Sequence, residues 1–153
     1  MFKGGRDVAA GEETTMHKAN VISTMNEALA MELTSALKYL AWSFNVFGPA
    51  RKPVVEHFLE EAKESLDHAT MLGEKVVALG GKPVVRADAP EPTDGLTVDD
   101  MLKLAVENEK AALDVYARLL EMVQDETHLR VLFENQIQME QEHLEEVSKM
   151  LRR

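Results

Sequence analysis

The sequence contains no cysteine, and aromatic residues make up only 5% of its 153 positions. The absence of cysteine excludes disulfide bonds, thiolate zinc sites and iron–sulfur centres. A metal site in this chain would therefore use carboxylate oxygens and imidazole nitrogens. Glycine and proline are also scarce, with 8 and 5 residues. Ala, Leu, Glu, Met and Lys dominate instead, a composition that favours helix over sheet.

Long apolar runs are absent as well. No segment approaches the roughly 18 apolar residues that span a bilayer, and residues 1–20 lack the hydrophobic segment of a secretory signal. The formal net charge of −10 and the pI near 5.0 predict repulsion from phosphate backbones and from anionic lipid. We therefore expect a cytoplasmic protein with no membrane partner, and we do not expect a nucleic-acid partner.

The length fits one domain with a sizeable core. Residues 1–13 contain glycine and show no periodicity, so we predict a flexible N-terminal tail there and a single bundle domain over residues 14–153. Within that domain, apolar residues recur at helical spacing in four segments. These segments start after Thr14 and Thr15, at Pro53, after the cap-like Thr97, and after the polar stretch "QDETH".

The connections between the four segments are short, long and short. Short connections make the helices that they join antiparallel neighbours. The long connection, "GKPVVRADAPEPTDGL", has no period and holds three of the five prolines. At about 3.3–3.6 Å per residue it can run the length of a helix and return the chain to the far end of the molecule. The sequence thus predicts an all-α four-helix bundle with one long crossover between helices 2 and 3.

Several acids stand on the apolar stripes of these helices, where burial of an unpaired carboxylate would cost several kcal/mol. Glu32 lies between apolar residues of the first helix, and Glu107 occupies a similar place in the third. In the fourth helix, Glu140 and His143 are set among apolar residues. Such acids need a compensating partner, and cations are the natural one for an acidic chain.

The two halves of the chain repeat one spacing. In each half a histidine follows an inward-facing glutamate by 36 residues, and the halves are offset by 75. A duplicated helical hairpin would show such an offset. It aligns three pairs of residues: Glu32 with Glu107, Ser65 with Glu140, and His68 with His143.

This pattern is close to a known ligand set. Carboxylate-bridged di-iron and di-manganese bundles use one carboxylate from each of two helices and Glu-x-x-His from each of the other two. Carboxylates can bridge two cations and neutralise their charge, and one imidazole per metal leaves positions open for oxygen or peroxide. A single Glu-x-x-His among 27 acids is more often part of a charge network. The matched pair favours the metal interpretation.

Over about residues 17–151 the chain resembles the bacterioferritin and ferritin-like di-iron carboxylate family, as a non-haem member. The matching stretches are "MELTSALKYLAW", "EAKESLDHATMLGEKVVALGGKP", "AVENEKAAL" and "EQEHLEEV". The resemblance implies a ferritin-like four-helix bundle with a di-iron ferroxidase centre, in which iron, or alternatively manganese, is the metal. The ligands that it implies are Glu32, His68, Glu107, Glu140 and His143.

The chain departs from the family at two positions of its second helix. Ser65 stands where the family has a carboxylate, three residues before His68. Glu64, four residues before His68, can share its helical face. We predict that Glu64 supplies the missing oxygen ligand; the alternative is a weak metal position filled by water. Leu66 stands where haem-binding members have a methionine, so no haem is expected.

Tyr39 is a catalytic candidate because it follows Glu32 by seven residues, two turns along the same helical face. It is placed to hydrogen-bond a ligand carboxylate or to donate an electron to an oxidised centre. A core tyrosine with its hydroxyl satisfied is the structural alternative.

These patterns and the resemblance together predict a ferroxidase-type oxidoreductase that oxidises Fe²⁺ with O₂ or H₂O₂. We expect a homo-oligomer, and iron storage or detoxification if the oligomer forms a closed shell. Two other functions are compatible with the sequence. One is a di-metal enzyme, with iron or manganese, that removes peroxide. The other is a non-catalytic ferritin-like bundle whose metal site is degenerate at Ser65.

Overall fold

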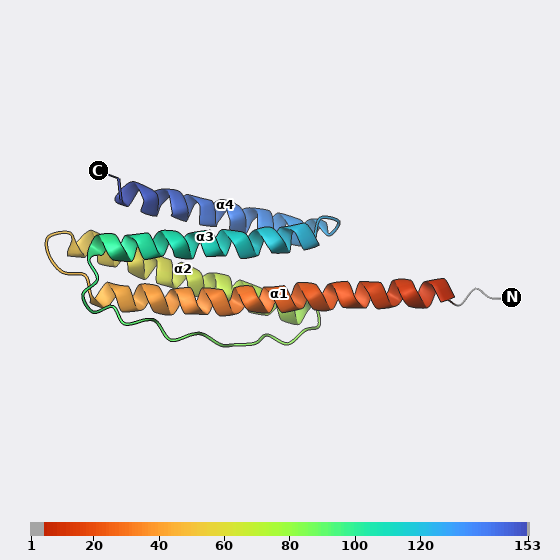
Figure 1. The fold of residues 1–153 in the computed structure, drawn as a ribbon. Coiled ribbons are helices and arrows are strands. Elements are labelled where there is room, and N and C mark those ends of the chain that lie inside the picture. Colours follow the sequence, from red (N-terminus) through yellow and green to blue (C-terminus); the bar gives the residue numbers. More distant parts are fainter. Residues whose placement is uncertain (1–4, 153) are drawn as a thin grey trace.

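The computed structural model describes residues 5–152, with side chains from residue 9 onward. In Figure 1, α1 and α2 run antiparallel, as do α3 and α4, whereas α2 and α3 run parallel because the connection between them returns alongside α1. The predicted four-helix bundle with one long crossover is confirmed. No helix in the described range is both long and apolar enough to cross a membrane. The helices are α1 (Gly5–Phe44), α2 (Arg51–Ala78), α3 (Val98–Met122) and α4 (Thr127–Met150).

The ends of two helices follow from local chemistry. Thr97 caps α3, because its hydroxyl accepts from the N–H of Asp100 at 3.1 Å and the Asp100 carboxylate accepts from the N–H of Thr97 at 3.0 Å. The cap expected at Thr97 is therefore confirmed, in the form of a capping box. At the end of α2, Gly80 adopts a φ of +83°, a left-handed conformation that favours glycine. Its N–H donates to the carbonyl of Val77.

The start of α1 corrects the predicted N-terminal tail over residues 1–13. Residues 5–13 belong to the helix, and residues 1–4 lie outside the described part of the chain. The hydroxyl of Thr14 donates to the carbonyl of Ala10 at 2.9 Å, as a threonine inside a helix does. No proline interrupts this stretch, so helical hydrogen bonding propagates outward from the packed part of α1. The extension projects beyond the bundle (Figure 1).

The core consists of two hydrophobic clusters with a polar layer between them. Along α1, the residues of the first cluster precede Glu32 and those of the second follow it. Along α2 the order is reversed, because the helix runs the other way. The polar layer therefore lies in the middle of the bundle. The fully buried members are Met25, Ala28, Leu72, Val76, Tyr116, Leu119 and Phe133 in the first cluster, and Val46, Phe58, Met101 and Ala105 in the second.

Candidate metal centre

Every helix contributes a buried ionisable side chain to the polar layer. Glu32 of α1, Glu109 of α3 and Glu140 of α4 expose at most 3% of their surface, which is unusual for glutamate. The second helix contributes Glu61 and His68, which are also buried, and α4 adds His143, which is nearly so. His68 follows Glu61 by seven positions, so two helical turns place them on the same face of α2.

Glu32, His68 and Glu140 form a first trio. Nδ1 of His68 lies 3.3 Å from Oε1 of Glu32 and 3.0 Å from Oε1 of Glu140. One potential ligand atom from each of the three residues lies within 4.8 Å of the others. This spacing allows a single cation to contact all three side chains.

Glu61, Glu109 and His143 form a second trio of the same kind. Nδ1 of His143 lies 3.4 Å from Oε2 of Glu61 and 3.8 Å from Oε2 of Glu109. Glu140 reaches this trio as well, because its Oε2 lies 3.6 Å from Nδ1 of His143. Its two oxygens therefore face the two trios, which is the geometry of a bridging carboxylate. The imidazole rings of His68 and His143 are stacked at 6.3 Å.

The donor set suits a pair of cations better than it suits the protein alone. Oε1 of Glu140 is fully buried and accepts no well-aligned hydrogen bond from the described residues, although His68 is close. A buried acceptor without a donor costs free energy that a cation would recover. The cavity enclosed by the two trios is about 10 Å³, space for little more than one water-sized particle. Carboxylates and imidazoles are ligands of iron and manganese.

Burial and mutual repulsion shift the pKa values of these groups. Burial raises the pKa of Glu61 to about 7 and, with the adjacent Glu140, that of Glu109 to about 9. For His68 and His143, burial lowers the pKa, but the neighbouring acids outweigh it and raise the values to about 10 and about 9. Burial also raises the pKa of Glu140, but proximity to the two imidazoles lowers it to about 2. At neutral pH the metal-free layer thus retains protons.

Two buried tyrosines hold acids of opposite trios. Tyr116 of α3 donates its hydroxyl to Oε1 of Glu32 at 2.6 Å, and Tyr39 of α1 donates to Oε1 of Glu109. Gln136 donates in turn to the hydroxyl of Tyr116 at 3.4 Å. The predicted position of Tyr39 beside an inward-facing acid is thus observed. These bonds fix the orientation of both carboxylates from across the bundle.

Glu107 does not lie with the other predicted site residues, and its prediction as an inward-facing acid is corrected. Its side chain is 71% exposed and lies 3.6 Å from the ammonium group of Lys110. Glu109 faces the polar layer instead, because it continues the buried face of α3 between Ala105 and Ala112. Two residues correspond to about 200° around a helix, so only one of the two glutamates can point inward.

A repeat in the sequence identifies Glu109. It aligns the two halves of the chain at an offset of 77 residues, whereas our prediction used 75. Tyr39 follows Glu32 by seven residues, and Tyr116 follows Glu109 by seven. This Glu-x₆-Tyr pattern relates α1 to α3 at an offset of 77, whereas α2 and α4 are related at 75. The equal 36-residue spacing that pointed to Glu107 therefore does not hold for the buried acids.

The second helix places its acids differently from the prediction. Ser65 is buried and faces the cavity, where it brings no carboxylate. Glu61, one turn earlier, lies in the second trio, and our sequence reasoning missed it. The signal was present, since Glu61 is three residues after the buried Phe58. Glu64 is partly exposed, and its carboxylate lies 2.6 Å from Nε2 of His143, on the opposite side of that ring from Nδ1.

Comparison with known proteins gives three matches that bear on this site. A family model described as a ferritin-like domain matches residues 22–153. The bacterioferritin of Desulfovibrio desulfuricans is 26% identical over 129 residues, which cover 83% of this chain and 72% of that protein. Among solved structures, a ferritin-like, diiron-carboxylate protein from Bacillus anthracis is 28% identical and has a TM-score of 0.79, with 88% of this chain and 97% of that one covered.

A Dps from Thermosynechococcus elongatus superimposes with a TM-score of 0.84 over 92% of this chain and 96% of that one. It is 21% identical to this chain and therefore supports the fold alone.

Proposed function

Because the chain belongs to the ferritin-like domain family, we propose that it binds two iron ions between its helices and oxidises Fe²⁺ with dioxygen or hydrogen peroxide. The predicted resemblance to this family is confirmed. The observation that carries the functional proposal is the pair of buried carboxylate–histidine trios joined by Glu140. The diiron-carboxylate description of the Bacillus anthracis relative supports iron as the metal.

Each trio would hold one ion. Glu32 and His68 would bind the first, Glu109 and His143 the second, and Glu140 would bridge the two. Their carboxylates offset the charge of the cations, which removes the repulsion among the acids of the metal-free layer. We propose that Glu61 completes the second trio in place of the carboxylate that Ser65 lacks.

Glu64 would act on the site through a histidine rather than as a direct ligand. Its carboxylate lies at Nε2 of His143, while Nδ1 of the same ring faces the second trio. A carboxylate at the outer nitrogen fixes the tautomer and the orientation of a metal-binding imidazole. This assignment replaces our prediction that Glu64 fills the vacant ligand position.

The proposed reaction transfers two electrons from two Fe²⁺ ions to one oxidant. With dioxygen, two electrons and two protons give hydrogen peroxide; with hydrogen peroxide, two electrons and two protons give two water molecules. Bound iron supplies this redox chemistry. Tyr39 orients Glu109. We propose that Tyr39 also donates an electron to an oxidised centre when fewer than two Fe²⁺ ions are available, and that a later Fe²⁺ returns this electron to it. We also propose a cytoplasmic homo-oligomer, with iron storage if its copies enclose a shell.

Two glutamates on α3 give a matched test. We expect Glu109→Gln to lose one of the two Fe²⁺ ions that bind per chain without oxygen, and to slow oxidation by at least tenfold after air is admitted. Glu107→Gln should bind and oxidise Fe²⁺ as the unchanged protein does, because Glu107 is exposed. Isothermal titration and the near-ultraviolet absorbance of ferric product measure the two quantities. Failure of the unchanged protein to bind Fe²⁺ would refute the proposal.

The same preparation separates the two other functions compatible with the sequence. Peroxide consumption that is faster with Mn²⁺ than with Fe²⁺, without net accumulation of ferric product, would indicate a peroxide-removing enzyme. A protein that gains no thermal stability from either metal would be a non-catalytic bundle, since a ligand that binds the folded state raises its melting temperature.

A further inference from the structure

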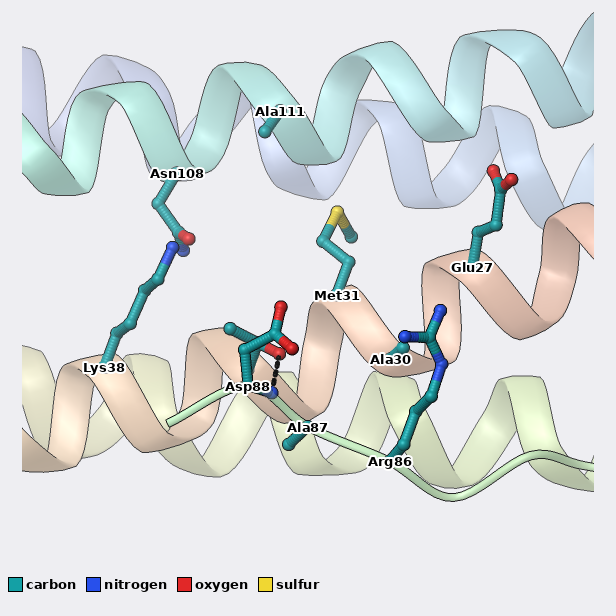
Figure 2. Close-up of a pocket in the computed structure, with 10 residues that line it drawn as sticks. Glu27, Ala30, Met31, Lys38, Arg86, Ala87, Asp88, Asn108 and Ala111 are labelled. Atoms are coloured by element: carbon teal, nitrogen blue, oxygen red, sulfur yellow. Dashed lines mark hydrogen bonds between the residues drawn. The ribbon is translucent and has the colours of Figure 1, made fainter. Parts of the chain in front are cut away.

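Asn108 stands between the buried trios and the outside of the bundle on the side of α1 and α3. It lines the cavity of the trios, and it also lines two larger surface hollows of about 290 and 390 Å³. The first of these, shown in Figure 2, lies between α1, α3 and the crossover segment. Since one residue borders all three spaces, rotation of its side chain would connect a surface hollow with the metal cavity.

A hydrogen bond between side chains holds Asn108 in this position. Its Nδ2 lies 2.9 Å and its Oδ1 lies 3.1 Å from Oγ of Ser35, a residue of α1 that is 3% exposed. The bond joins two side chains on different helices, so breaking it leaves the helical backbone bonds intact. Rotamer changes of this kind are fast compared with the opening of a helix. The pair therefore forms a latch that side-chain motion can release.

The charge closest to the latch, on Lys38, does not favour a divalent cation. Figure 2 shows the Lys38 side chain directed toward Asn108 across the first hollow, and Lys38 also lines the second. The first hollow contains Arg86 as well, together with the acids Glu27 and Asp88, and the second contains the acids Glu91 and Glu107. Glu27 pairs with Arg118 at 3.1 Å. An ammonium group at the opening repels Fe²⁺, whereas a neutral molecule does not experience this repulsion.

The side formed by α2 and α4 has the opposite character. Glu64 is partly exposed there and contacts His143. The exposed acids Glu60 and Glu146 lie close enough to act electrostatically on the nearby His57. Glu64 thus borders the second trio, and the two exposed acids near His57 add negative charge on the same side, which attracts divalent cations. The two sides of the bundle thus suit different reactants.

We propose that Asn108, latched by Ser35, is the gate through which an uncharged oxidant, dioxygen or hydrogen peroxide, reaches the trios, while Fe²⁺ enters between α2 and α4. This inference rests on the proposed function, because it requires iron in the trios. Asn108 thereby determines which reactant passes on the α1–α3 side. It takes no part in the electron transfer itself.

Nitric oxide, an uncharged diatomic molecule that binds Fe²⁺ without oxidising it, tests the gate independently of ferroxidase activity. We expect Asn108→Ala to speed its anaerobic association with the Fe²⁺-containing protein about fivefold, the rate equivalent of one net hydrogen bond of ~1 kcal/mol. Thr34→Ala is the matched control, because Thr34 lines the same hollow but not the metal cavity. Its rate should be unchanged. Stopped-flow absorbance gives the rates.

The binding rate of Co²⁺, measured without oxygen, should be the same in Asn108→Ala, Thr34→Ala and the unchanged protein. Equal nitric oxide rates in all three, or a rise in the Co²⁺ rate that matches the nitric oxide rise, would overturn the gate. If Asn108→Ala fails to fold, Ser35→Ala releases the same latch and should give the same acceleration. A protein that shows the expected nitric oxide rates but does not oxidise Fe²⁺ would refute the proposed function and leave the gate standing.

Discussion

Glu61 lies one helical turn before Ser65, and its carboxylate reaches the polar layer. Ser65 itself has no carboxylate. Both residues are buried on the same face of α2. On α4 the order is exchanged: the acid is Glu140, and the residue one turn earlier is Gln136, an amide that binds Tyr116. Each of these two helices therefore supplies one acid and one neutral polar side chain to the site. The serine removes no charge, because the acid has moved by one turn.

We expect Glu61→Gln to lower the number of tightly bound Co²⁺ ions from two per chain to one. The change removes a negative oxygen from the second trio while keeping the size of the side chain. Glu60→Gln is the control, since Glu60 is exposed and belongs to neither trio. Anaerobic calorimetric titration measures the stoichiometry. Two ions bound by Glu61→Gln with unchanged affinity would show that Glu61 is not a ligand.

At the residue scale, the sequence predicted which site residues share a face of one helix. It did not predict which residues of different helices face one another. His143 and Glu140 were found because Glu-x-x-His has a fixed geometry on a single helix. Glu107 was chosen over Glu109 because we assumed the same number of residues between the acid and the histidine in both halves. That number depends on how the connections and helix ends are built. The buried face of α3, marked by Ala105 and Ala112, is what selects Glu109.

At the scale of helices, a periodic pattern of apolar residues predicts which helical segments are packed. It does not predict helical segments that are exposed to solvent. The four packed segments and the crossover were predicted because packed faces need apolar residues at helical spacing and prolines interrupt helices. The first part of α1 was not predicted, because residues 9–20 are exposed and show no stripe. A helix that already exists in the bundle extends easily into such a stretch, since adding a turn needs no new nucleus.

Gly73, inside α2, and Gly80, just beyond its end, should respond oppositely to substitution by alanine. Gly73 lies inside the helix, and an added Cβ would meet only an ordinary contact with Pro83 at 3.9 Å. Gly73→Ala should therefore stabilise the protein by about 0.5–1 kcal/mol. Gly80 has a φ of +83°, so Gly80→Ala should destabilise it by about 1 kcal/mol. Urea unfolding measures both free energies, and a loss of stability in Gly73→Ala would contradict the expectation.

At the scale of the whole molecule, exposed apolar side chains gather on the side where the crossover leaves α2. Leu66, Val77 and Val85 are at least half exposed and border a groove of about 310 Å³. Exposed apolar patches of this kind in a highly charged protein commonly mark an interface. None of the residues given for the groove lines the metal cavity, so an interface there would leave the site intact.

If this side joins copies of the chain, Leu66→Lys should lower the solution mass of the protein, because a buried ammonium group at an apolar interface is costly. Val131→Lys is the control, since Val131 is an exposed apolar residue on α4 away from the groove. Size-exclusion chromatography with light scattering gives the masses. An unchanged mass for Leu66→Lys, or an equal loss in both variants, would place the association elsewhere.

The stability of the whole bundle should depend on pH in opposite senses with and without metal. The pKa values of Glu109 and His143 are raised to about 9 in the folded protein, so the stability that their protons provide is lost as pH rises toward 9. Cations replace these protons, and metal affinity therefore increases over the same range. We expect the rise in melting temperature caused by Co²⁺ to be larger at about pH 8 than at about pH 6.

Differential scanning calorimetry on the metal-free and Co²⁺-containing protein measures this difference. Glu109→Gln should reduce the pH dependence of the metal-induced rise, since it removes one of the groups whose proton the metal displaces, and Glu107→Gln should preserve it. A rise that is independent of pH in the unchanged protein would mean that the metal binds without displacing protons from the trios. Such binding would occur outside the polar layer, because the acids and histidines there must lose their protons before they can act as ligands.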